Sequence, residues 1–132
     1  MLASLPSHGL NVGTVLVLED EVLVAVVIED LLLDQGAAEV FVCRDADEAQ
    51  ALVALRNVDC AILDVKIGDS DCFGLADDLN RREVPFFFAT ASGPEAVAER
   101  HRHRPILAKP YSNDQLLEFM QAAILAQREE LS

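Results

Sequence analysis

The sequence predicts an α/β fold of the (βα)5 type, in which five short parallel strands alternate with helices and form one doubly wound sheet. Apolar runs of four to six residues recur along the chain, and longer stretches of helical composition separate them. Elements that alternate in this way form parallel sheets, because each helix returns the chain to the same end of the sheet. The 132 residues suit one domain whose core needs neither a metal nor a disulfide.

The first part of the chain is predicted to form a strand, a helix and a second strand. The run 15–18 is continuous and apolar, as in a central strand that is buried on both faces. The stretch 21–35 contains valines that would also suit a strand, but its length and the alternation of elements favour a helix. Gly36 is a suitable C-terminal cap. The apolar run 39–43 then predicts the second strand.

The middle of the chain continues the same alternation. Asp45 opens the second helix, because Glu48 follows it at the spacing of a capping box. The third strand is predicted at 59–64. A polar loop at 66–71, which contains a glycine, then leads to a helix that runs to about Arg82.

The fourth strand is predicted at 86–90, after Pro85, which stands where a strand can spare its N–H. Ser92 and Glu95 again have capping-box spacing, and Pro94 falls in the first turn. We therefore expect a helix that runs from this cap to the basic segment 100–104.

The chain is predicted to end with a strand at 106–109 and a helix that Ser112 and Gln115 cap. The apolar side chains of this helix fall on one stripe of a 3.6-residue period; they are Leu116, Leu117, Met120 and Ile124.

Composition argues against several classes of partner. The chain has 10 Lys and Arg residues against 23 Asp and Glu residues, a formal net charge of -13, so nucleic acid and anionic membranes would repel it. Its start lacks the basic and long apolar regions of a signal peptide, and Glu29 and Asp30 interrupt the later apolar stretch 22–33. The three cysteines lack metal-ligand spacing and predict reduced thiols: Cys43, Cys60 and Cys72. We expect a cytoplasmic protein that binds neither nucleic acid nor membranes.

Polar side chains stand at the ends of four of the five predicted strands. Glu19 and Asp20 follow the first strand, Asp64 ends the third, Thr90 ends the fourth and Lys109 ends the fifth. Ligands of doubly wound sheets bind at the edge where the carboxyl ends of the strands meet, so these side chains should converge there. Clustered carboxylates repel one another unless a proton or a cation lies among them. Oxygen ligands suit a hard cation such as Mg²⁺.

Four stretches of the sequence together resemble the receiver domain of two-component response regulators. They are VLVLEDE, AILDVKIGDSD, FFFATAS and LAKPY, and their order and spacing extend the resemblance from Thr14 to about Gln127. The FAT that ends at Thr90 also resembles the FATGUY signature of a group of stand-alone receivers, although Ala91, Ser92 and Gly93 follow it here.

The resemblance implies a flavodoxin-like fold with strand order 2-1-3-4-5. It also implies a receiver domain over residues 13–132 that follows an N-terminal tail over residues 1–12. A chain of this length leaves no room for an effector domain, so we expect a stand-alone receiver.

By the same resemblance Asp64 is the phosphoacceptor, which attacks the phosphohistidine of a sensor histidine kinase or of a histidine phosphotransfer protein. Glu19, Asp20 and Asp64 would hold Mg²⁺, and the backbone carbonyl of Lys66 would complete the protein ligands. Phosphoryl transfer of this kind requires mainly alignment and neutralisation of charge.

The resemblance also assigns two residues to the phosphoryl group. Thr90 would hydrogen-bond a phosphoryl oxygen, and the ammonium group of Lys109 would neutralise its charge. The small side chain of Ala91 leaves the phosphoryl group an approach path. The bond from Lys109 to Pro110 is cis in family members, and an X-Pro bond is where a cis bond is tolerated.

Two residues depart from the family pattern. Ile106 stands where most receivers carry Tyr or Phe, so the aromatic switch that follows the movement of the threonine is absent at this position. Gly68 replaces a proline that is common in the loop after the acceptor, and glycine gives that loop more freedom.

Three functions remain open from the sequence. A phosphorylatable receiver would signal to a downstream protein or serve as a phosphate sink. A pseudo-receiver would bind partners regardless of phosphate, which Ile106 favours. A phosphohydrolase is the third alternative, but that class usually needs a second acid where Lys66 stands. His101 and His103 could suggest a metal pair, yet a spacing of two residues points them apart on a helix.

Overall fold

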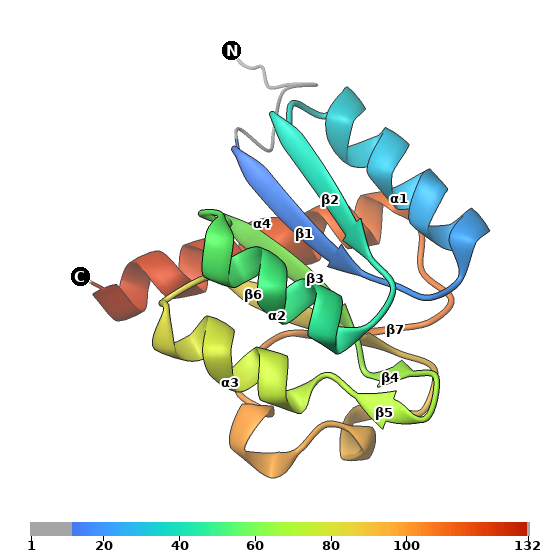
Figure 1. Cartoon of the computed structure of the whole chain (residues 1–132), viewed down its shortest axis with the longest axis vertical. Helices are drawn as coiled ribbons and strands as arrows, with labels where there is room; N and C mark the ends of the chain where they lie inside the picture. Colours follow the sequence, from blue (N-terminus) through green and yellow to red (C-terminus); the bar gives the residue numbers. More distant parts are fainter. Residues whose placement is uncertain (1–11, 132) are drawn as a thin grey trace.

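Five parallel strands form the central sheet of the computed structural model, which describes residues 12–131 (Figure 1). They are β1 (Thr14–Leu18), β2 (Glu39–Cys43), β3 (Cys60–Asp64), β6 (Phe86–Thr90) and β7 (Ile106–Ala108). Their order in the sheet is β2-β1-β3-β6-β7. This order is 2-1-3-4-5 when only these five strands are counted, so the predicted flavodoxin-like fold is confirmed.

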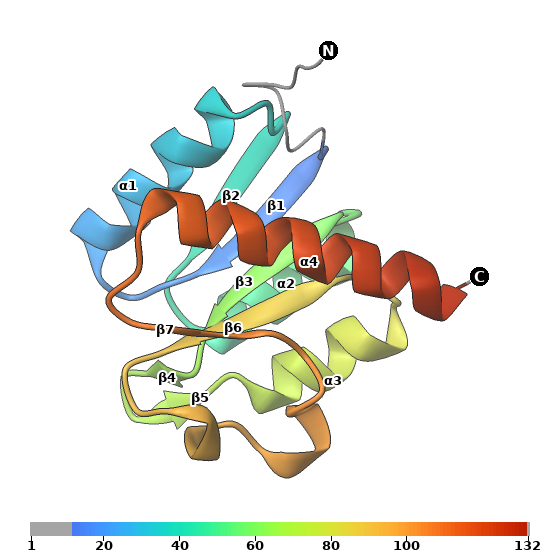
Figure 2. The same cartoon turned by 180° about the vertical axis from the view of Figure 1, so that it is seen from behind.

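Helices cover both faces of the sheet (Figures 1 and 2). Helices α1 (Val22–Asp34) and α4 (Asn113–Leu131) lie on one face, and α2 (Ala46–Leu55) and α3 (Phe73–Arg81) lie on the other. Successive side chains of a strand point to opposite faces. Phe86 and Phe88 therefore pack toward α2 and α3, whereas Phe87 packs toward α1 and α4. Burial on both faces explains why the sequences of the three inner strands, β1, β3 and β6, are almost entirely apolar.

Three predicted helix ends are confirmed. The N–H of Glu48 donates to Asp45 Oδ1 at 2.8 Å at the start of α2. Before α4, the N–H of Gln115 donates to Ser112 Oγ at 3.1 Å, and the N–H of Ser112 donates to Gln115 Oε1 at 2.9 Å. Gly36 follows α1 with a φ of 109°, a conformation that glycine adopts without strain.

The prediction of a helix from 92 to 104 is wrong. Two short 3-10 helices replace it, η2 (Pro94–Ala96) and η3 (Glu99–His101). The backbone is extended at Val97 and Ala98 between them. Gly93 rather than Ser92 precedes the first turn, and the predicted capping hydrogen bond from Ser92 is absent there.

Side-chain contacts hold this segment in its non-helical path. Arg102 Nε donates to the carbonyl of Val97 at 2.9 Å, and its Nη2 donates to the carbonyl of Glu95 at 3.3 Å, so a guanidinium takes the place of helical N–H groups. The residue His101 is only 1% exposed, and its Nε2 lies 2.8 Å from Asp77 Oδ1 on α3. His103 is exposed, so the two histidines lie in different environments.

A second difference concerns the loop that follows β3. It contains a two-stranded antiparallel hairpin, β4 (Lys66–Ile67) and β5 (Ser70–Asp71), which the polar sequence did not predict. Ile67 anchors this hairpin, since its side chain is buried in the core on the α2 and α3 face.

The predicted tail, 1–12, lies outside the described residues except for Val12, which packs in the layer beneath α1 and α4. Of the helices between residues 12 and 131, none combines the length and the apolar composition that a bilayer crossing needs.

Candidate functional site

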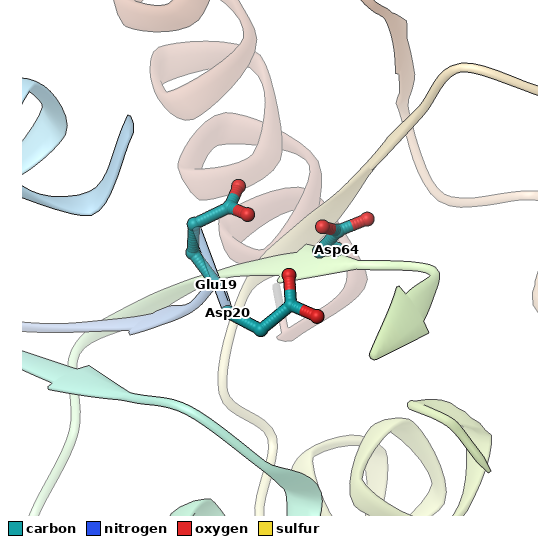
Figure 3. Close-up of side chains that lie close together, drawn as sticks. All are labelled: Glu19, Asp20 and Asp64. Carbon is teal, nitrogen blue, oxygen red and sulfur yellow. The ribbon is translucent and has the colours of Figure 1, made fainter. Parts of the chain in front are cut away.

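Three carboxylates meet at the carboxyl edge of the sheet. Glu19 and Asp20 follow β1 and Asp64 ends β3, and Figure 3 shows their side chains turned toward one another. One oxygen from each lies within 4.8 Å of the others. The parallel register explains this meeting, because Leu18 of β1 pairs with Leu63 of β3 and the next residue on each strand is an acid.

Glu19 is a buried acid with only 3% of its surface exposed. Its Oε2 accepts a hydrogen bond from the N–H of Glu21 at 3.2 Å, and its Oε1 accepts one from Lys109 Nζ at 3.3 Å. Burial raises the pKa of Glu19 above its ordinary value, although the N–H of Glu21 and the charge of Lys109 act in the opposite direction. Asp20 is more exposed than Glu19 and accepts from the N–H of Gly68 at 3.2 Å.

Lys109 joins two of the carboxylates. Its Nζ lies 3.1 Å from Asp64 Oδ2 and 3.3 Å from Glu19 Oε1. Burial alone would lower the pKa of Lys109, but the charges of Asp64 and Glu19 outweigh burial and raise this pKa above its usual value. The side chain is therefore an ammonium ion at neutral pH. The peptide bond from Lys109 to Pro110 is cis.

Thr90 ends β6, the neighbour of β3, and its side chain is buried. Asp64 pairs with Ala89, so Thr90 stands one residue beyond the level of Asp64 at the same edge of the sheet. Its Oγ1 accepts a hydrogen bond from the N–H of Ser92 at 3.0 Å. The proton of this hydroxyl remains available to an acceptor in the site.

Comparison with known proteins identifies the family. The model of the response regulator receiver domain matches residues 15–121. This chain belongs to that family. The receiver is therefore a module of two-component signalling, and the resemblance inferred from the four sequence stretches is confirmed.

Several proteins are similar to this receiver. SdrG of Sphingomonas melonis Fr1 is 35% identical, with a TM-score of 0.71, and the match covers 86% of this chain and 97% of SdrG. The transcriptional regulatory protein PdtaR of Mycobacterium tuberculosis is 30% identical over 119 residues, which are 87% of this chain. The receiver spans 58% of the length of PdtaR.

A third similarity concerns the fold alone. The N-terminal signal receiver domain of a two-component response regulator from Bacteroides fragilis is 20% identical, with a TM-score of 0.73. The match covers 86% of this chain and 97% of that domain.

Two other predicted site residues stand outside the carboxylate cluster of the receiver. Lys66 begins β4 two residues after Asp64, and its side chain is exposed. Ile106 begins β7 opposite Phe88 of β6 and is partly buried against the core on the α2 and α3 face. Ile106 therefore fills apolar space. The rings that pack around Phe88 are those of Phe73, Phe86 and His101.

Sequence reasoning missed a groove beside Lys109. It has a volume of about 540 Å³ and lies between α1 and the start of α4. Leu23 and Val27 of α1 line it together with Ala91 and Lys109 from the site. The many valines of α1, which suited either a strand or a helix, were the available signal, because a solvent-facing helix seldom carries so many.

The residues of the receiver fit Mg²⁺. All of the side-chain donors are carboxylate oxygens, the ligands that hard cations prefer. Three carboxylates and one ammonium group leave a formal charge of two negative units, which a divalent cation would balance. Glu19, Asp20 and Asp64 are thus the side chains that would hold the ion.

Proposed function

We propose that this receiver takes a phosphoryl group onto Asp64 from the phosphohistidine of a sensor histidine kinase or of a histidine phosphotransfer protein. The contact of Asp64 Oδ2 with the Lys109 ammonium group, within a cluster of acids, is the observation that carries this proposal. The phosphorylated protein then signals through contacts with a downstream protein, or serves as a phosphate sink.

The transfer step needs little covalent chemistry from the protein. A carboxylate oxygen of Asp64 forms the new O–P bond while the N–P bond of the phosphohistidine breaks, and the departing imidazole takes a proton from solvent. Lys109 neutralises charge on the phosphoryl oxygens, and the hydroxyl of Thr90 donates to one of them. Mg²⁺, held by Glu19, Asp20, Asp64 and the carbonyl of Lys66, would supply the remaining charge neutralisation.

Other parts of the proposal follow from the same groups. Water can attack the phosphoryl group on Asp64, so we also propose slow self-catalysed hydrolysis of the aspartyl phosphate. We propose that the receiver domain comprises residues 13–132. We also propose that the protein acts in the cytoplasm. Its net charge of -13 supports protein partners rather than nucleic acid or membranes. A pseudo-receiver that ignores phosphate is the second candidate, and Ile106 is the residue that favours it.

Intact-mass analysis after incubation with acetyl phosphate and Mg²⁺ tests the acceptor. The wild type should gain one phosphoryl group, and it should gain none when the metal is chelated before the reaction. Asp64→Asn should gain none under either condition. Asp69→Asn is the matched control, because Asp69 lies in the exposed turn of the β4–β5 hairpin and outside the carboxylate cluster. An adduct on both proteins would overturn Asp64 as the acceptor, and an adduct on neither protein would favour the pseudo-receiver.

The exposed apolar side of α1 is the proposed docking surface for the phosphodonor. Leu23 is 82% exposed, and it lines the groove that continues to Ala91 and Lys109. A protein that carries the phosphohistidine must bring it to Asp64, so the surface beside the acceptor has to be part of its footprint. An apolar surface of the donor fits this groove, since most of the side chains that line it are apolar.

Leu23→Arg should slow transfer from a phosphorylated histidine phosphotransfer domain at least ~10-fold, the effect of burying an unpaired charge at an interface. Phosphorylation by acetyl phosphate should stay unchanged, because this small donor needs no docking surface. Leu55→Arg is the matched control, since Leu55 is 83% exposed on α2. Equal rates for the two arginine variants with the protein donor would exclude this surface.

A further inference from the structure

One carboxylate of the cluster is held differently from the other two. Glu19 and Asp64 both contact the ammonium group of Lys109. Asp20 does not, and within residues 12–131 the one hydrogen bond to its carboxylate comes from the N–H of Gly68 at 3.2 Å. The position of Asp20 in the cluster therefore depends on the loop that follows the acceptor strand.

The hairpin in that loop fixes the direction of the Gly68 N–H. Gly68 is the first of the two residues that connect β4 to β5, and its φ is 61°. Ser70 Oγ donates to the carbonyl of Ile67 at 3.1 Å, which braces the turn from within. The N–H of Phe73 donates to Asp71 Oδ1 at 3.0 Å, which ties the hairpin to the start of α3.

We propose that Gly68 is a positioning residue, whose N–H holds the Asp20 carboxylate beside Glu19 and Asp64 in readiness for the cation. This inference rests on the proposed function, because it assigns Asp20 to the metal. A ligand that is already in place loses less side-chain freedom when the ion binds. The same contact couples the metal site to the hairpin that carries Lys66, whose carbonyl is the fourth proposed ligand.

Residue 68 can make this contact because it is a glycine and not a proline. A proline at this position, which is common in the family, has no N–H and fixes φ near −65°. Glycine supplies the N–H and adopts the positive φ without strain. A Cβ atom at residue 68 would meet nothing within 4 Å, so the turn has space for a larger residue that keeps the N–H.

Two variants separate the N–H from the shape of the turn. Gly68→Asn keeps the N–H and tolerates positive φ, so its Mg²⁺ dissociation constant by calorimetry should stay within about twofold of the wild type. Gly68→Pro removes the N–H and should weaken Mg²⁺ binding about fivefold, as expected for one lost net hydrogen bond. Equal affinities of the proline and asparagine variants would overturn the inference.

A measurement without substitution at residue 68 covers the case in which Gly68→Pro alters the whole hairpin. The amide proton of Gly68 should exchange with solvent several-fold faster in Asp20→Ala than in the wild type, because its acceptor is gone. The amide of Gly36, which donates to the carbonyl of Leu33, should not change. An unchanged exchange rate at Gly68 would overturn the inference.

The results also separate this inference from the proposed function. A wild type that binds Mg²⁺ but takes no phosphoryl group on Asp64 would overturn the function, while the two Gly68 variants still test the positioning role. A wild type that is phosphorylated, with proline and asparagine variants of equal affinity, would overturn the positioning role alone. A wild type that binds no Mg²⁺ would overturn both.

Discussion

Lys109→Gln should lower the rate of phosphorylation by acetyl phosphate at least ~100-fold, which is the usual effect of removing one preorganised charge-stabilising group. Glutamine keeps most of the length of the side chain and removes its charge. The ammonium group lies 3.1 Å from Asp64 Oδ2, so it stands where the proposed transfer would accumulate negative charge. Initial rates of adduct formation, followed by intact mass, measure the effect.

The other lysine of the chain is the matched control for this substitution. Lys66 lies two residues after Asp64, but its side chain is exposed, and only its backbone carbonyl has a proposed role. Lys66→Gln should therefore keep the wild-type rate within about twofold. Equal losses in the two variants would mean that general electrostatic attraction of the donor, rather than the position of Lys109, controls the rate.

His101→Ala should lower the free energy of unfolding by about 2–4 kcal/mol, since it leaves a cavity in the core and removes the ring contact with Asp77, which keeps only its hydrogen bonds from Arg100. The ring of His101 is almost fully buried and packs against Phe73, Phe86 and Phe88. Its Nε2 also contacts Asp77 Oδ1 at 2.8 Å. Urea unfolding measures the change.

Exposure distinguishes His101 from its neighbour. His103→Ala should change the unfolding free energy by less than about 0.5 kcal/mol, because His103 is exposed. His101→Phe should recover much of the loss seen for His101→Ala, since the ring contacts remain. If the two alanine variants were equally stable, the packing of His101 would not hold the segment 93–104.

The stability of the fold should also depend on pH through His101. Burial, which outweighs the hydrogen bond and charge of Asp77, lowers the pKa of His101 below its ordinary value. The unfolded chain therefore takes up this proton first, and stability falls as the pH drops through about 6.5. His101→Phe lacks this loss, so it should gain in stability relative to the wild type between about pH 7.5 and 5.5.

The strands could be predicted because the apolar pattern of the local sequence decides where they form. An uninterrupted apolar run such as 86–90 suits only a strand that is covered on both faces, and all five of its residues are buried. The capping boxes at Asp45 and Ser112 could be predicted for a similar reason, since the hydrogen bonds join residues three apart in sequence.

The failed helix shows where local information ends. Val97, His101 and Arg104 are buried, and their spacing of four and three residues is that of a helix face. The same spacing also fits a chain of extended and 3-10 backbone, provided that each of these side chains packs in the core or binds a partner there. Asp77 on α3 binds Arg100 and His101, and contacts of this kind with another element decide the path.

The candidate site also has a part that the sequence could predict and a part that it could not. Convergence of Glu19, Asp64 and Lys109 follows from parallel strands of matched register, so the sequence was enough to predict it. The hydrogen bond from Gly68 to Asp20 joins residues 48 positions apart and depends on a hairpin that the sequence did not reveal. The roles of Thr90 and of the Lys66 carbonyl toward a phosphoryl group or an ion stay predictions.

Backbone hydrogen bonds continue past the ends of the strands at the carboxyl edge. The N–H of Lys109 donates to the carbonyl of Thr90 at 2.9 Å, and the N–H of Val65 donates to the carbonyl of Ala89 at 3.2 Å. The hydroxyl of Thr90 and the ammonium group of Lys109 therefore belong to one mechanical unit, in which a displacement of one strand end carries its neighbour along. Free-energy changes from substitutions at these two residues should not add, because each alters the position of the other.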